Sequence, residues 1–189
     1  MRISPLGLGG STGARSFVRL LAPARIGDTF NFYAHGAGAQ TRARRLEEYL
    51  DARAAAPVLL VGEAAGYRGA RVSGLPFTSE RQLTGAGPAE ATATIVQRTL
   101  AELGLAERVL LWNVVPTHPH RPGEPASNRP PTRAEAEAAA PFLAALAHGR
   151  RVVAVGRIAH ARLGGEHVRH PSHGGAAAFR DGLRRLLLQ

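Results

Sequence analysis

Four short apolar segments, each followed by a turn and then by a helical segment, constrain the fold of this chain most strongly. The first is Val58–Val61, which ends at Gly62. Val109–Trp112, Val152–Val155 and the more polar Glu166–His170 follow it along the chain. Short apolar runs bounded by turn residues are typical of strands buried on both faces of a parallel sheet. The alternation predicts an α/β fold, a three-layer α/β/α arrangement around a central four-stranded parallel sheet.

The segments between the strands predict the rest of the domain. Apolar spacing and capping signals predict helices over residues 41–55, 88–105, 132–148, 157–163 and 176–188. Pro116–Pro131 contains six prolines and two histidines, so we expect a long surface loop there. Residues 1–30 carry scattered glycines and predict an irregular arm with a single helical turn. Residues 31–189 then form one domain.

Composition narrows the classes of function. The chain has no cysteine, which excludes disulfides and thiolate metal sites and is compatible with a reducing cytoplasm. No segment reaches the roughly 20 apolar residues that cross a bilayer. The net charge of +10 comes from arginine alone, which favours a polyanionic partner such as DNA. A GC-rich coding bias would explain the missing lysines but not the charge excess. We expect a monomeric cytoplasmic protein.

Polar residues stand where the predicted strands end. Glu63, Asn113 and His170 each lie at or just after a strand end. Ligands of open parallel sheets gather beyond the carboxyl ends of the strands, so we expect these three side chains on one rim. The glycine-rich loop Gly62–Gly69 matches neither a P-loop nor a dinucleotide fingerprint and is equally compatible with a structural turn.

The turn between the last strand and the last helix has two interpretations. His170–Gly175 precedes a helix, whose first backbone amides can hold a phosphate, but a plain surface loop fits the residues as well. His167, His170 and His173 are three residues apart, yet a proline-containing loop would not keep them on one helical face. We therefore expect no metal site, and we interpret His118 and His120 as loop residues.

Five segments in this order resemble the motifs of the uracil-DNA glycosylase superfamily, over the chain from about Asn31 to its end. They are Gly62–Gly66, Pro76–Phe77, Asn113–Val115, Asn128–Thr132 and His170–Ser172. The first is most similar to the Gly-Glu-Ala-Pro-Gly of the iron–sulfur branch, with alanine in place of proline. The resemblance implies a monofunctional DNA glycosylase that flips uracil or another deaminated base out of DNA and hydrolyses its glycosidic bond.

The resemblance also implies roles for individual residues. Glu63 would orient water and stabilise the sugar cation, and His170 would stabilise the departing base. Phe77 would stack on the base and Asn113 would read its edge, in a pocket formed also by Gly62 and Ala64. Residues expected to grip DNA phosphates are Arg68, Arg71, Ser172, His173 and Gly174.

Several departures from the family pattern limit these expectations. Thr117 and a small residue near Ala139 stand where the iron–sulfur branch has cysteines, so we expect no cluster and no cofactor. Ala64 replaces an acid or amide, and Gly66 offers no bulky gate against the methyl group of thymine. The turn after His173 lacks a large apolar wedge. Two alternatives therefore stay open: a superfamily member that binds DNA or a modified base without excision, and a small-molecule hydrolase or nucleotide-binding enzyme on a similar sheet.

Overall fold

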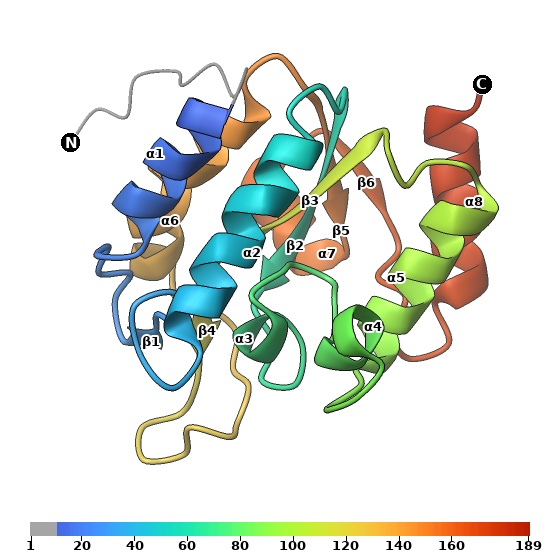
Figure 1. Ribbon diagram of the computed structural model, residues 1–189. Coiled ribbons are helices and arrows are strands. Elements are labelled where there is room, and N and C mark those ends of the chain that lie inside the picture. Colours follow the sequence, from blue (N-terminus) through green and yellow to red (C-terminus); the bar gives the residue numbers. More distant parts are fainter. Residues whose placement is uncertain (1–10) are drawn as a thin grey trace.

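The structure, a computed structural model, describes residues 11–189. At its centre lies a sheet of four parallel strands in the order β3-β2-β5-β6 (Figure 1). The strands are β2 (Val58–Ala64), β3 (Val109–Val115), β5 (Arg151–Val155) and β6 (Glu166–Val168). The predicted α/β fold with a four-stranded parallel sheet is confirmed, and its last strand ends at Val168 rather than at His170.

Helices cover both faces of this sheet. They are α1 (Ser11–Leu21), α2 (Ala39–Ala52), α3 (Ala70–Ser73), α4 (Glu80–Thr84), α5 (Ala91–Glu102), α6 (Arg133–Ala147), α7 (Arg157–Leu163) and α8 (Ala176–Leu187). Buried residues of α1, α2, α6 and α7 join one apolar cluster, and those of α5 and α8 join a second. Figure 1 shows α1 and α6 on one side of the sheet and α5 and α8 on the other.

The central strand β2 explains why its sequence is apolar without interruption. Leu59 and Val61 belong to the first cluster, while Val58 and Leu60 belong to the second. Successive side chains of a strand point to opposite faces, so a strand covered on both faces needs apolar residues at every position. Because β2 pairs with both β3 and β5, it delivers Glu63 to the middle of the sheet's carboxyl edge.

The expectation of an irregular arm over residues 1–30 is wrong for Ser11–Leu21, which forms the helix α1. Phe17 and Leu21 are completely buried, and the Phe17 ring packs edge-to-face on Trp112 and Phe142 at centroid distances of 5.5 and 5.6 Å. The apolar residues of α1 recur every three to four positions, which is the helical signal that the scattered glycines nearby obscured. The expected features of residues 1–10 lie outside the described residues.

The expectation of a surface loop over Pro116–Pro131 is wrong at its beginning. His118–Pro119 forms the short strand β4, which pairs antiparallel with β1 (Thr29–Phe30). Thr117 and His118 are completely buried, so this part of the segment belongs to the interior of the protein. The capping box predicted at the start of α6 is present: Thr132 Oγ1 accepts from the Glu135 amide, and the Glu135 carboxylate accepts from the Thr132 amide.

Candidate active site

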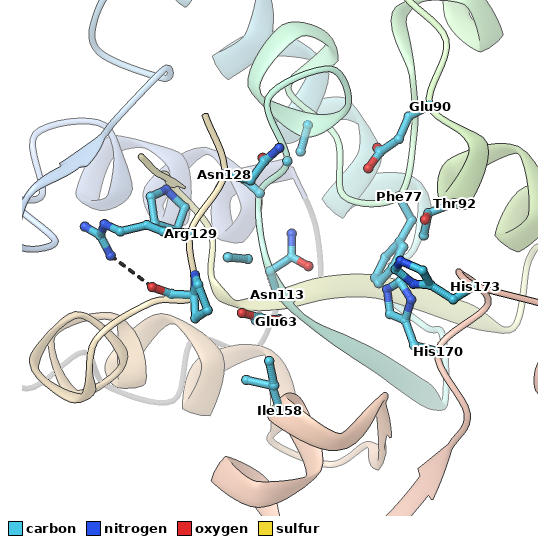
Figure 2. Close-up of a pocket in the computed structure, with 16 residues that line it drawn as sticks. Glu63, Phe77, Glu90, Thr92, Asn113, Asn128, Arg129, Ile158, His170 and His173 are labelled. Atoms are coloured by element: carbon cyan, nitrogen blue, oxygen red, sulfur yellow. Dashed lines mark hydrogen bonds between the residues drawn. The ribbon is translucent and has the colours of Figure 1, made fainter. Parts of the chain in front are cut away.

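A cavity of about 470 Å³ opens at the carboxyl edge of the sheet (Figure 2). Glu63 and Ala64 reach it from the end of β2, and Asn113 reaches it from β3. Phe77 comes from the loop between α3 and α4, and His170 from the turn before α8. The three strand-end residues that the sequence placed on one rim therefore line one cavity.

Glu63 presents a carboxylate with no protein partner. The side chain is half-buried, and no donor among residues 11–189 hydrogen-bonds to it. Burial raises the pKa of Glu63, because removal from water disfavours the charged form. A carboxyl group in this state is available to hold a water molecule or to face a cationic centre.

Phe77 and Asn113 are packed together over Gly62. A Cβ atom at position 62 would lie 2.4 Å from Phe77 Cζ and 2.7 Å from Asn113 Oδ1, so only glycine leaves room for both side chains. Phe77 has a left-handed φ of 49°, and Gln97 donates to its carbonyl at 3.1 Å. A non-glycine residue held in this region is strained, and such strain concentrates at functional sites. Gly62 thus lies directly against the Phe77 ring and leaves space for it.

The Asn113 amide is buried but unengaged. Its side chain lines the cavity at 4% exposure, and it makes no hydrogen bond with the described residues. A buried amide normally has partners for its donor and its acceptor. A ligand that offers one acceptor and one donor side by side would satisfy both.

His170 is held in one tautomer by its own turn. The Ser172 backbone amide donates to His170 Nδ1 at 3.2 Å, and Ser172 Oγ lies 2.7 Å from the same nitrogen. A backbone amide can only donate, so Nδ1 accepts and the proton of the neutral ring resides on Nε2. Burial first, then Arg169 and His173, lowers the pKa of His170. The site therefore contains a neutral imidazole with a free N–H.

Comparison with known proteins identifies the family of this chain. The family model described as "Uracil DNA glycosylase superfamily" matches residues 50–185. The chain belongs to the uracil DNA glycosylase superfamily. Among solved structures, wild-type SMUG2 from Pedobacter heparinus is similar, with a TM-score of 0.67 and 12% identity over 90% of this chain and 93% of that one. A search of curated protein sequences found no significant match.

This member of the uracil DNA glycosylase superfamily places its predicted phosphate-binding residues on two different surfaces. His173 lines the cavity, and Ser172 lines an adjoining hollow of about 720 Å³ that also contains Arg157 and Arg169. Gly174, with φ of 74°, shapes the turn between His173 and α8. This turn is the part of the predicted set that adjoins Glu63 and His170.

Arg68 and Arg71 lie elsewhere. They line a separate hollow of about 330 Å³ beside the loop after β2. The Arg71 guanidinium stacks on the Tyr67 ring at 4.1 Å and donates to the Tyr67 carbonyl at 3.1 Å. The structure therefore does not bring these two arginines into the cavity with Glu63.

The cavity also contains residues that the sequence did not single out for it. Glu90, Thr92 and Ile158 line it, although they come from the start of α5 and from α7. Asn128 also lines the cavity and links its segment to the loop after β2, because Asn128 Oδ1 accepts a hydrogen bond from the Tyr67 backbone amide at 2.9 Å. Asn128 carried a signal, as did Arg129 and Pro130, which also line the cavity, because all three belong to a segment that resembles the family. Glu90 and Ile158 stand in no motif, and only the packing of α5 and α7 reveals them.

The residues present do not fit an iron–sulfur cluster. Cluster ligands are thiolates, and the chain has no cysteine. Thr117 instead hydrogen-bonds through its hydroxyl to Thr29, and Ala139 is packed in the apolar core. Within residues 11–189, no group of three or more His, Asp or Glu side chains is arranged to hold a metal ion. None of the helices in the same range is long and apolar enough to span a membrane.

Proposed function

We propose that this chain is a monofunctional DNA glycosylase that removes uracil or another deaminated base by base flipping and hydrolysis of the N-glycosidic bond. The observation that carries the proposal is the meeting of Glu63, Phe77, Asn113 and His170 around one cavity (Figure 2). These four side chains come from four separate segments of the chain. Together they offer a stacking surface, an amide, an N–H donor and a carboxylate, which are the groups that excision of a base requires.

Binding of the flipped base falls to Phe77 and Asn113. The Phe77 ring offers a flat apolar surface for a heterocycle, and the Asn113 amide offers a donor and an acceptor to its edge. Uracil presents the O4 acceptor and the N3–H donor side by side. O4 can therefore accept from the amide nitrogen while N3–H donates to the amide oxygen. Cytosine presents a donor next to an unprotonated nitrogen and matches the amide only if the amide flips.

Departure of the base falls to His170. Cleavage leaves negative charge on the base, and in uracil this charge is shared by the carbonyl oxygens. A neutral imidazole whose Nε2–H donates a hydrogen bond to O2 would stabilise that charge. Preorganised donors of this kind contribute about 10²–10³-fold in rate.

Attack on the sugar falls to Glu63. Its carboxylate faces the cavity without a protein partner, so it can stabilise the cationic sugar and orient the attacking water. Ala64 and Ala65 follow it where other branches carry polar or rigid residues, so the hydrolytic step rests on Glu63 alone. The Ser172 hydroxyl and the amides of His173 and Gly174 would hold the neighbouring phosphates at the start of α8.

The test is an excision panel. Single- and double-stranded oligonucleotides that carry uracil, hypoxanthine or xanthine are incubated with the protein and then heated in alkali. We expect strand scission with at least one base, and only after alkali, since a monofunctional enzyme leaves an intact abasic strand. No scission above that of a His170→Ala variant on any substrate would reject the proposal.

A second candidate is a member that binds DNA or a modified base without excision, which Ala64 and Ala65 beside Glu63 favour. It predicts DNA affinity that depends on salt and survives the double change of Glu63→Gln and His170→Ala. A measurement of binding to the same oligonucleotides, set beside the panel, separates the two candidates, because binding without scission in the wild-type protein supports only the second.

A further inference from the structure

A second acidic side chain, Glu90, lies in the cavity and has no role in the chemistry proposed above. It immediately precedes α5 and lines the cavity together with Gly66, Phe77 and Asn113. The Thr94 hydroxyl donates to the Glu90 backbone carbonyl, but no donor within residues 11–189 reaches the Glu90 carboxylate. Burial also raises the pKa of Glu90. A half-buried carboxyl group without a protein partner takes its hydrogen bonds from water or from a ligand.

The Glu90 carboxyl group occupies the space above the glycine-rich loop. A Cβ atom at Gly69 would lie 1.8 Å from Glu90 Oε2, and one at Gly66 would lie 3.1 Å from Glu90 Oε1. Glu90 therefore fills the place into which a side chain at position 66 would project. Gly66 itself carries no group that could block a methyl substituent on the base, and Glu90 supplies a polar group at that position from a different segment.

The orientation of the base directs one ring position toward Glu90. In a pyrimidine, C5 lies across the ring from C2. If His170 donates to O2, a substituent on C5 points away from His170. In the view of Figure 2, the Phe77 side chain lies between those of Glu90 and His170, and all three line one cavity, so the C5 substituent would face Glu90.

We propose that Glu90 is a specificity-determining residue that rejects the 5-methyl group of thymine; the inference rests on the function proposed above. A methyl group at C5 would displace water from the carboxyl group and offer it no hydrogen bond. The hydrogen of uracil leaves room for that water. A hydroxymethyl group at C5 would donate to the carboxyl group, so bases with a donor at this position are accepted.

The test replaces the carboxyl group by an apolar group of similar length. Glu90→Met, Glu90→Ala and Glu90→Gln are compared with the wild-type protein on single-stranded oligonucleotides that carry one uracil, thymine or 5-hydroxymethyluracil in thymine-free flanks. The matched control is Glu102→Met, which changes an exposed glutamate of the same helix. The measured quantities are the excision rates of thymine and of 5-hydroxymethyluracil, each relative to uracil in the same sample, so a loss of folded protein cancels.

Glu90→Met and Glu90→Ala should raise the thymine-to-uracil ratio by roughly 10- to 100-fold and lower the 5-hydroxymethyluracil-to-uracil ratio by at least about 10-fold. Glu90→Gln, which keeps a polar group, and Glu102→Met should leave both ratios within about threefold of the wild-type values. Unchanged ratios in the Met and Ala variants, with uracil still excised, would overturn the role of Glu90 and leave the proposed function standing. A wild-type protein that releases hypoxanthine or xanthine but no uracil would overturn the role of Glu90 alone. One that releases none of the three bases would overturn both.

Discussion

At the scale of single residues, the candidate site depends on side chains that are placed without protein partners. Glu63 and Asn113 face the cavity with their polar groups unengaged by the described residues, and His170 is fixed through Nδ1 so that Nε2 stays free. Gly62 makes the arrangement possible because it has no side chain. Such groups reduce stability and are retained where a ligand will complete them.

Gly62→Ala tests the contact beneath Phe77. The added methyl group would lie 2.4 Å from Phe77 Cζ and would push the ring out of the cavity. We expect a loss of about 1–3 kcal/mol in the free energy of unfolding and a sharp fall in excision rate, measured by urea denaturation and by the oligonucleotide assay. In a Phe77→Ala background the same change should cost clearly less, since the clashing ring is gone. An equal loss in both backgrounds would contradict the contact.

The pH dependence of excision tests Glu63. Burial raises the pKa of Glu63, and the proposed reaction uses the carboxylate form, so the rate should fall as the pH drops through this raised pKa. Single-turnover rates between about pH 4 and 8 measure this fall in rate on the acid side, the acid limb of the pH profile. Glu63→Gln should lack it, whereas His170→Gln should keep it at a lower rate. An acid limb that persists in Glu63→Gln would assign the titration to another group.

At the scale of elements, α1 is part of the core rather than an appendage. Its Phe17 ring packs against Trp112 of β3 and Phe142 of α6, so α1 helps to hold the strand that carries Asn113. Likewise, β4 lies close to the end of β2, where the buried His118 ring hydrogen-bonds through Nδ1 to the Ala65 carbonyl at 2.9 Å. The His118 contact helps to position the end of β2, which carries Glu63.

Phe17→Ala measures what α1 contributes. Removal of a completely buried aromatic ring should lower the free energy of unfolding by about 3–5 kcal/mol. Arg19→Ala, an exposed change on the same helix, should have little effect. Urea denaturation of both variants provides the comparison. Similar small effects for the two substitutions would mean that α1 is not required for the core.

At the scale of the whole molecule, the protein carries a net charge of +10, and its proposed substrate, DNA, is a polyanion. Arg157 and Arg169 adjoin the turn that contains Ser172, so part of the charge lies beside the cavity. A chain without lysine presents this charge entirely as guanidinium groups, which bind phosphate in a planar, two-pronged geometry.

Salt dependence of DNA binding tests this arrangement. With Glu63→Gln to prevent excision, affinity for a uracil-containing oligonucleotide should fall roughly 10- to 1,000-fold between about 50 and 200 mM salt, as counterions are released on binding. Arg169→Ala should reduce the slope of log affinity against log salt by about one. Arg44→Ala, which alters an arginine paired with Glu48 on α2, should leave that slope unchanged. Fluorescence anisotropy gives both slopes, and identical slopes for the two variants would exclude Arg169 from the interface.

The sequence by itself determined the sheet and the strand-end residues. A strand covered on both faces must be apolar throughout, and the carboxyl ends of parallel strands share one edge, so Val58–Val61 and the positions of Glu63, Asn113 and His170 followed from local pattern and topology. Helix α1 was also readable from its apolar spacing and was missed. The family resemblance added Phe77, which no periodicity would have indicated.

Only the tertiary structure decided the remaining features of the site. Glu90 lies against Gly66 and Gly69 because α5 packs beside the loop after β2, and no local signal in the sequence encodes that approach. Arg68 follows Glu63 closely in sequence yet lines another hollow, since the loop turns away from the cavity. Sequence spacing specifies which elements form and which ends they share, whereas distances between side chains on different elements depend on how those elements pack.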